Sequence, residues 1–121
     1  MKALRIVGAS GALLAVMLGA LGAHGLKTVL SESALHAFNT AVEYQMYHSL
    51  AVLLVCALPG LSARMAAKAA WCFVAGTVLF SGSIYGLTLA GLSWLGPVTP
   101  LGGLTMMAGW ILLIVSMIKG R

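Results

Sequence analysis

Apolar residues dominate four long blocks of the chain, at about residues 6–23, 34–58, 69–90 and 100–118. An α-helix rises about 1.5 Å per residue, so a helix of about 20 residues crosses the hydrocarbon core of a bilayer. Each block has about that length. The pattern therefore predicts four transmembrane helices.

Short polar connections separate the blocks and carry helix boundary signals. Ser31 or Ser33 is suited to cap the second helix by accepting a hydrogen bond from a free N–H of its first turn. Pro59 ends that helix because proline cannot continue the backbone ladder. Thr99 followed by Pro100 predicts the start of the fourth helix, with threonine as cap and proline as first helical residue.

Composition supports membrane insertion: 61% of the 121 residues are hydrophobic and 7% are charged, whereas soluble domains carry about 25% charged residues. Four spans use nearly the whole chain, which leaves no room for a soluble domain. A cleaved signal peptide is an alternative for the first block, but its length favours a retained helix. We expect one all-α domain over residues 1–121, an integral membrane four-helix bundle.

The net charge of +5 comes from scattered residues rather than a basic run, which argues against a nucleic-acid partner. Positive residues flank the membrane-spanning blocks, where they report topology. Six of them belong to the two termini and the connection between the second and third blocks, and Lys27 alone belongs to the other side. This asymmetry predicts that both termini are cytoplasmic. Trp110 falls mid-span, where the pattern assigns it no role.

Polar side chains gather on one face of the second helix, at about 100° of rotation per residue. They are His36, Asn39, Thr40, Glu43 and Tyr47, with Tyr44 and His48 on the flank. Gln45 points away from this face. Because a carboxylate in hydrocarbon costs at least ~2.5 kcal/mol, we expect the face to lie inside the bundle. Glu43 should then reach a hydroxyl or amide.

Depth in the membrane identifies polar groups on the third and fourth helices that could meet this face. Counting from the outer ends of the helices brings several hydroxyls to the depth of Glu43. The predicted intramembrane polar cluster contains Asn39, Glu43, Tyr44, Tyr47, His48, Ser81, Ser83, Tyr85, Thr99 and Thr105.

Small residues recur along the other helices and allow backbones to approach closely. The predicted packing positions are Gly8, Ala12, Ala15, Gly19, Ala23, Gly82, Gly86, Gly102, Gly103 and Gly109. This spacing arises easily by chance in segments rich in glycine and alanine.

The sequence carries no recognisable catalytic or metal-binding motif, and no Asp at all. Cys56 and Cys72 lack CxxC spacing, which favours packing roles. His24, His36 and His48 recur every twelve residues, which is not a helical face repeat. We therefore expect neither an enzyme nor a bound metal or cofactor.

Three roles remain open for the polar face. In the leading one, the protein is an accessory or structural partner in a membrane assembly, as a homo-oligomer or as a subunit of a larger complex, and Glu43 holds helices in register. In the second, Glu43 and His48 carry protons or small cations. In the third, Tyr44, Tyr47 and His48 bind a lipid or quinone beside an apolar groove.

Four segments also resemble a known family. They are "GALGAHGL" at 19–26, "AVEYQMYHSLA" at 41–51, "LFSGSIY" at 79–85, and "TPLGG" at 99–103 followed by "AGW". Together they resemble the domain of unknown function 423 family, which is related to the eukaryotic transmembrane protein 256 family. Leu21 departs from the aromatic residue of many members. The resemblance implies a multi-pass protein of the bacterial inner membrane and brings no activity or catalytic residue with it.

Overall fold

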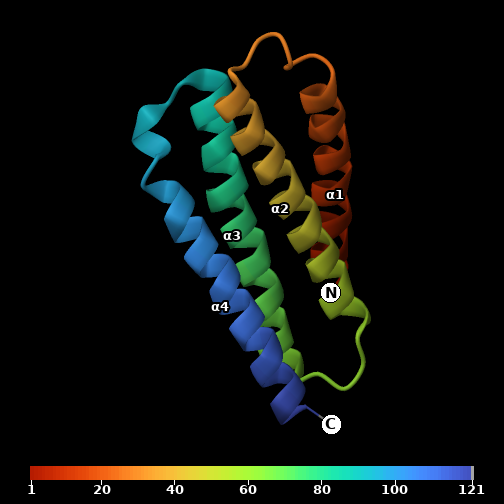
Figure 1. Ribbon diagram of the computed structural model, residues 1–121. Coiled ribbons are helices and arrows are strands. Elements are labelled where there is room, and N and C mark those ends of the chain that lie inside the picture. The colour runs from red at the N-terminus through yellow and green to blue at the C-terminus, as the bar shows by residue number, and fades with distance from the viewer. Residues whose placement is uncertain (121) are drawn as a thin grey trace.

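The computed structural model describes residues 1–120 and consists of helices joined by short connections (Figure 1). The α-helices are α1 (Lys2–Ala23), α2 (Glu32–Ala57), α3 (Ala63–Ala90) and α4 (Val98–Lys119), and a short 3-10 helix, η1 (Ser93–Leu95), precedes α4. No strand occurs among these residues, so the prediction of an all-α fold with four helices is confirmed.

Two of the predicted boundary signals act as expected on α2. Ser31 caps its start, because the Ser31 hydroxyl accepts a hydrogen bond of 3.2 Å from the Ala34 N–H. The helix ends at Ala57, before Pro59. Gly60 then adopts a φ of 76°, a left-handed conformation that glycine takes without steric cost.

The start of α4 differs from the prediction. The helix begins at Val98 with Pro97 at the cap position, and no side chain caps it. The expectation that Thr99 is the cap is therefore wrong, since its hydroxyl pairs with Ser83 of α3 instead. Pro100 still falls in the first turn, where backbone N–H groups lack an intrahelical acceptor and proline loses nothing.

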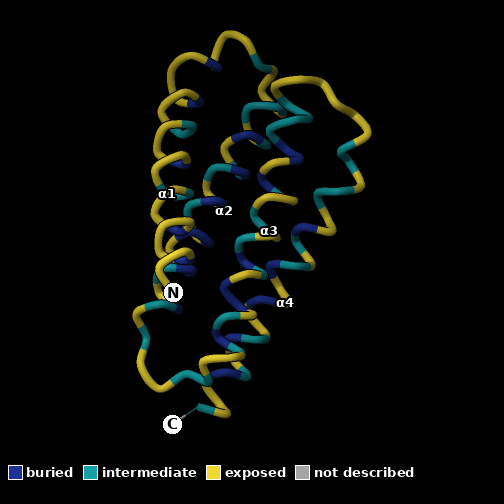
Figure 2. The backbone as a smooth tube through the Cα atoms, turned by 180° about the vertical axis from the view of Figure 1, so that it is seen from behind, coloured by how far each residue is buried: buried dark blue, intermediate teal, exposed yellow. Residues whose placement is uncertain are grey.

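The helices pack in chain order, α1 on α2, α2 on α3 and α3 on α4, while α1 and α3 touch only slightly (Figure 1). Figure 2 shows α2 between α1 and α3 from behind. Both termini lie toward the same end of the molecule. Because α1 packs almost only on α2, its outer face is exposed, including Leu13 and Val16.

Glycines set the close approach of α3 and α4. A side-chain carbon at Gly102 would collide with the backbone of Phe80, and one at Gly109 would lie 2.7 Å from the Phe73 ring. Gly76 packs equally closely against Met106. Since lipid tails are as apolar as the side chains, this tight packing is what favours helix association in a membrane.

The other predicted packing positions divide between contact and exposure. Gly8 and Gly19 face side chains of α2, Ala15 is buried, Ala12 is half-buried, Gly86 meets Leu95 of η1, and Gly103 only approaches the edge of Phe80. Two positions contradict the expectation: Ala23 is exposed, and Gly82 has no neighbour within 4 Å of a side-chain carbon. Gly22 takes the buried position beside Ala23, because small-residue spacing does not reveal which way the helix is turned.

Three segments are long and apolar enough to cross a membrane: α1, α3 and the segment Ser93–Lys119. Helix α2 is not among them, although it has 26 residues and packs between α1 and α3. The polar residues in its first half lower its hydropathy. That α2 also spans the membrane, and that both termini are cytoplasmic, stay predictions.

Candidate functional site

Gln45 is the central polar residue inside the bundle. Its side-chain N–H donates to the Gly11 carbonyl of α1 at 2.8 Å, and its Oε1 accepts from the Tyr85 hydroxyl of α3 at 2.6 Å. The buried Ser81 adds a third link by donating to the Ala41 carbonyl at 2.7 Å. Gln45 does point away from the face of Glu43, but that direction leads into the bundle, so the expectation that the Glu43 face is the inner one is wrong. Gln45 joins α1, α2 and α3.

A pattern in the sequence could have identified this inward face. Phe38, Ala41, Gln45 and Val52 are all buried and recur at helical spacing. All but Gln45 are apolar, so they form the stripe that should face the core. Burial of this stripe fixes the rotation of α2.

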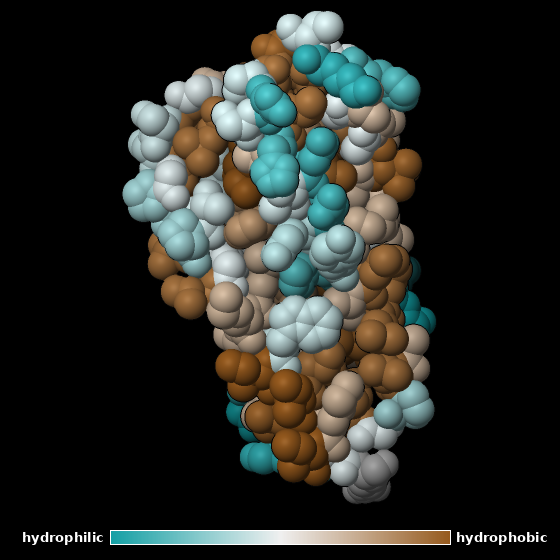
Figure 3. All heavy atoms as spheres, viewed as in Figure 1, coloured by the Kyte–Doolittle hydropathy of each residue, from teal (hydrophilic) through white to brown (hydrophobic). Residues whose placement is uncertain are grey.

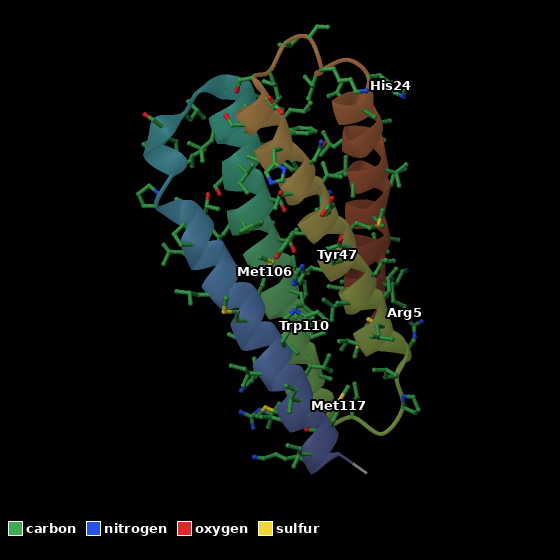
Figure 4. The ribbon with its side chains drawn as sticks, viewed as in Figure 1. Arg5, His24, Tyr47, Met106, Trp110 and Met117 are labelled. Atoms are coloured by element: carbon green, nitrogen blue, oxygen red, sulfur yellow. The ribbon has the colours of Figure 1, made fainter. Side chains whose placement is uncertain are left out.

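His48 lies on the same helix, with both ring nitrogens engaged. The Trp110 Nε1–H of α4 donates to His48 Nε2 at 3.1 Å. Indole nitrogen can only donate, so Nε2 accepts, and Nδ1 carries the proton that it donates to the Tyr44 carbonyl at 2.8 Å. The imidazole is therefore neutral and fully paired. Figure 4 labels Trp110 on α4, directed toward α2, and the hydrogen bond explains this mid-span tryptophan.

Glu43 contradicts the prediction that its carboxyl lies inside the bundle. It is exposed and accepts no hydrogen bond from any other described residue. The physical reason is that only one face of α2 can turn inward. Burying the apolar stripe stabilises the protein more than burying the Glu43 face would. Figure 3 shows the result as a hydrophilic band over the upper part of the visible face, above a hydrophobic lower part.

The outward residues form a row that we call the α2 outer face. It consists of His36, Thr40, Glu43, Tyr47, Leu50 and Leu54. Thr40 is half-buried and the others are exposed; Tyr47 is 54% exposed. Asn39, also exposed, stands beside the row next to α1. A carboxylate and its polar neighbours thus face outward from an apolar molecule.

The structure separates the rest of the predicted cluster. Ser83 and Thr99 pair through their hydroxyls between α3 and α4, and Thr105 donates to the Leu101 carbonyl of its own helix. Tyr44 is partly exposed, with its ring 5.0 Å from that of Phe80. The estimated depth in the membrane placed these groups in the same part of the bundle. It contains no information about which side of each helix they lie on.

A cleft between α1 and α3 was not predicted. It has a volume of about 280 Å³, α2 forms its floor, and its lining is mostly apolar. Gln45, Ser49 and Thr77 add polar groups, and the buried Thr77 hydroxyl has no hydrogen-bond partner in the described part of the chain. The small residues Gly8, Gly11 and Gly82, which line it, were the available signal.

Metal-ligating side chains do not gather anywhere in residues 1–120. No group of three His, Cys, Asp or Glu residues lies close enough there to hold a metal ion. Cys56 and Cys72 are free and half-buried.

Comparison with known proteins identifies the family. A family model described as "Protein of unknown function (DUF423)" matches residues 18–103. The chain belongs to the DUF423 family. The matched DUF423 segment contains the whole of α2 and α3, and hence Gln45, His48 and the α2 outer face.

Relatives of this DUF423 chain are named as membrane proteins. The UPF0382 membrane protein YwdK of Bacillus subtilis is 43% identical over 121 residues, and the UPF0382 membrane protein SAB0533 of Staphylococcus aureus is 42% identical over 119 residues. Each alignment covers 98% of this chain and 98% of the relative. No solved structure matches the chain. The chain is therefore similar to membrane proteins of about its own length, and the names of these relatives state no reaction.

Proposed function

We propose that this DUF423 protein is a structural subunit of a protein assembly in the bacterial inner membrane, and that the α2 outer face is its contact surface. The observation that carries the proposal is the outward position of Glu43, together with Asn39 and Tyr47. Polar groups that face lipid are costly, and contact with another protein surface removes that cost. An accessory role follows from this need for a neighbour.

The interior polar groups favour a structural role over proton transfer. Gln45 is hydrogen-bonded to α1 and α3, and His48 is hydrogen-bonded to α4. His48 has no free ring nitrogen to pass a proton onward. The transporter alternative would thus have to rely on Glu43 alone.

Membrane placement is part of the proposal. Helix α2 has 26 residues, compared with 22 in α1 and 28 in α3, and it packs along both, which supports a fourth span. The positive residues near the two termini and near the α2–α3 connection support cytoplasmic termini.

Photo-crosslinking in native membranes tests the contact surface. A photoreactive phenylalanine derivative replaces Tyr47 on the outer face, and matched controls replace Leu13 on α1 and Ile114 on α4, which are 62% and 55% exposed. We expect protein adducts at Tyr47 and lipid adducts at the two controls. Lipid adducts alone at Tyr47 would contradict the proposal.

A second candidate function is the binding of a lipid or quinone-like molecule, and the cleft between α1 and α3 favours it. The cleft is apolar with a few polar groups, as ligand sites usually are. Of the three residues expected to bind such a molecule, His48 lines the cleft, whereas Tyr44 and Tyr47 do not. Gly82 lines the cleft, and no atom lies within 4 Å of a side-chain carbon at this position, so Gly82→Leu adds an apolar side chain to the lining. Loss of a co-purifying lipid or quinone in this variant, measured by mass spectrometry, would support binding there, whereas an unchanged complement would argue against it.

A further inference from the structure

We infer that the neighbour on the α2 outer face is a second copy of this chain, packed α2 against α2 about a two-fold axis along the membrane normal. The inference rests on the proposed structural function and names the partner. It is carried by the spacing of the outer face, by its hydrogen-bonding groups and by its lower apolar half.

The spacing keeps the outer face continuous. The six positions 36, 40, 43, 47, 50 and 54 alternate steps of four and three residues, an average of 3.6. That average is the repeat of a straight α-helix, so the six residues stay on one side of α2 along its length. The same row is exposed over its whole length apart from the half-buried Thr40. A second α2 can therefore follow it from His36 to Leu54.

The polar half of the row is complementary to itself. Glu43 offers carboxylate acceptors, while Asn39 and Tyr47, one helical turn to either side, offer an amide and a hydroxyl donor. None of the three side chains is hydrogen-bonded to another described residue. In a two-fold contact, each residue of one copy meets its complement on the other, and the complement meets it in return.

The direction of the side chains brings these groups together. The two copies run parallel, so all their side chains lean toward the same end. The Glu43 carboxylate leans toward Asn39 of the second copy, one turn nearer the N-terminus, and the longer Tyr47 side chain leans toward Glu43 from the other side. Four donors, two from each copy, then surround the two carboxylates and offset their mutual repulsion.

The composition of the outer face favours a second copy over an unrelated subunit. It carries an acid but no Lys or Arg, and both donors that the acid needs are already present beside it. Below them, Leu50 and Leu54 are 51% and 46% exposed and provide apolar contact at the same spacing. The same surface can therefore form both sides of a two-fold interface.

Disulfide crosslinking tests the dimer without removing the polar groups. In a Cys56→Ser, Cys72→Ser background, single cysteines replace Thr40, Leu50 or Leu54 on the outer face, and Leu13 or Ile114 serve as matched exposed controls. Copies with two different epitope tags are expressed together, and the membranes are oxidised before extraction. We expect dimers that contain both tags at the outer-face positions and little at the controls. Equal or stronger crosslinking at Leu13 or Ile114 would overturn the inference.

Substitution of Glu43 gives a second measurement in the Leu50→Cys protein. Glu43→Gln keeps acceptor and donor capacity and should keep crosslinking near its original level, whereas Glu43→Leu removes the central acceptor and should lower it several-fold. Because Glu43 is exposed, neither change should disturb the fold, which thermal unfolding in detergent checks. Undiminished crosslinking in the Leu variant would count against the polar contact.

The outcomes separate this inference from the proposed function. Photo-crosslinks from Tyr47 to a protein of another size, without mixed-tag dimers, would overturn the second copy and leave the structural role intact. Absence of any protein adduct at Tyr47, together with absence of dimers, would overturn both.

Discussion

Trp110 and His48 form a hydrogen bond of 3.1 Å between α4 and α2, two helices that otherwise share few contacts. The indole also packs near Phe73, with ring centres 4.7 Å apart. The bond ties the last helix to the first half of the chain.

Trp110→Phe should therefore lower thermal stability in detergent. The change keeps an aromatic ring but leaves His48 Nε2 without its donor, at a cost of about 1 kcal/mol. The matched control is Trp71→Phe, because Trp71 is 49% exposed and should tolerate the change. An equal loss of stability in both variants would contradict the role assigned to the bond.

Gln45→Leu should destabilise the protein more than Tyr85→Phe. The first change strands the Gly11 carbonyl and the Tyr85 hydroxyl, at a cost of about 1–3 kcal/mol, whereas the second removes one of the two bonds. The double variant should lose less stability than the sum of the two single variants, because both act on one bond. Full additivity in detergent unfolding would show that the bond between Gln45 and Tyr85 contributes little to stability.

Gly102→Ala should disrupt the packing of α3 and α4. The added methyl group meets the Phe80 backbone, which cannot move aside as a flexible side chain could, and overpacking of this kind costs about 1–3 kcal/mol. Gly82→Ala is the control, since nothing lies within 4 Å of its new carbon. If both variants unfold at the same temperature, the close approach of these helices is not needed for stability.

Glu43→Gln separates the structural role from cation transport. The exposed side chain keeps its size and hydrogen-bonding capacity but loses its charge, so folding and abundance should stay near wild type. Proteoliposomes that contain wild-type protein or the variant should show the same pH-dependent flux as empty vesicles. Flux in the wild type that disappears in a stable Glu43→Gln protein would establish the transport alternative instead.

Cysteine labelling in intact cells tests the orientation. Ser31 and Ala63 are exposed and lie in different connections or at their edges. With cytoplasmic termini, a cysteine at Ser31 should react with a membrane-impermeant reagent added from outside, and one at Ala63 should not. The opposite pattern would reverse the topology.

The sequence was sufficient for the helices but not for the rotation of α2. Length and hydropathy located the four helices, and Ser31 marked the start of the second. Polarity alone then predicts the wrong rotation of α2. It accounts for the cost of exposing Glu43 to lipid but not for the larger gain from burying Phe38, Ala41 and Val52. Inward Gln45 and outward Glu43 differ by only two positions, so this error moved the candidate site to the opposite side of the helix.

Partners across helices were equally hidden from the sequence. Depth placed Ser83 and Thr99 in the same outer half of the bilayer, and they do pair. It gave no means to pair His48 with Trp110, which are separated by 62 positions. The cleft is lined by residues of α1, α2 and α3, so it cannot be recognised until the packing of these three helices is known.

Packing in chain order also bears on how the protein assembles during synthesis. Each helix makes most of its contacts with the helices just before and after it. Once α2 is in place, α1 already has almost its full set of neighbours, and α3 packs first on α2 and then makes its largest contact with α4. Contacts that are local in the chain form without a long search. The helices can therefore pack one at a time, and His48 of α2 gains its Trp110 donor when α4 arrives.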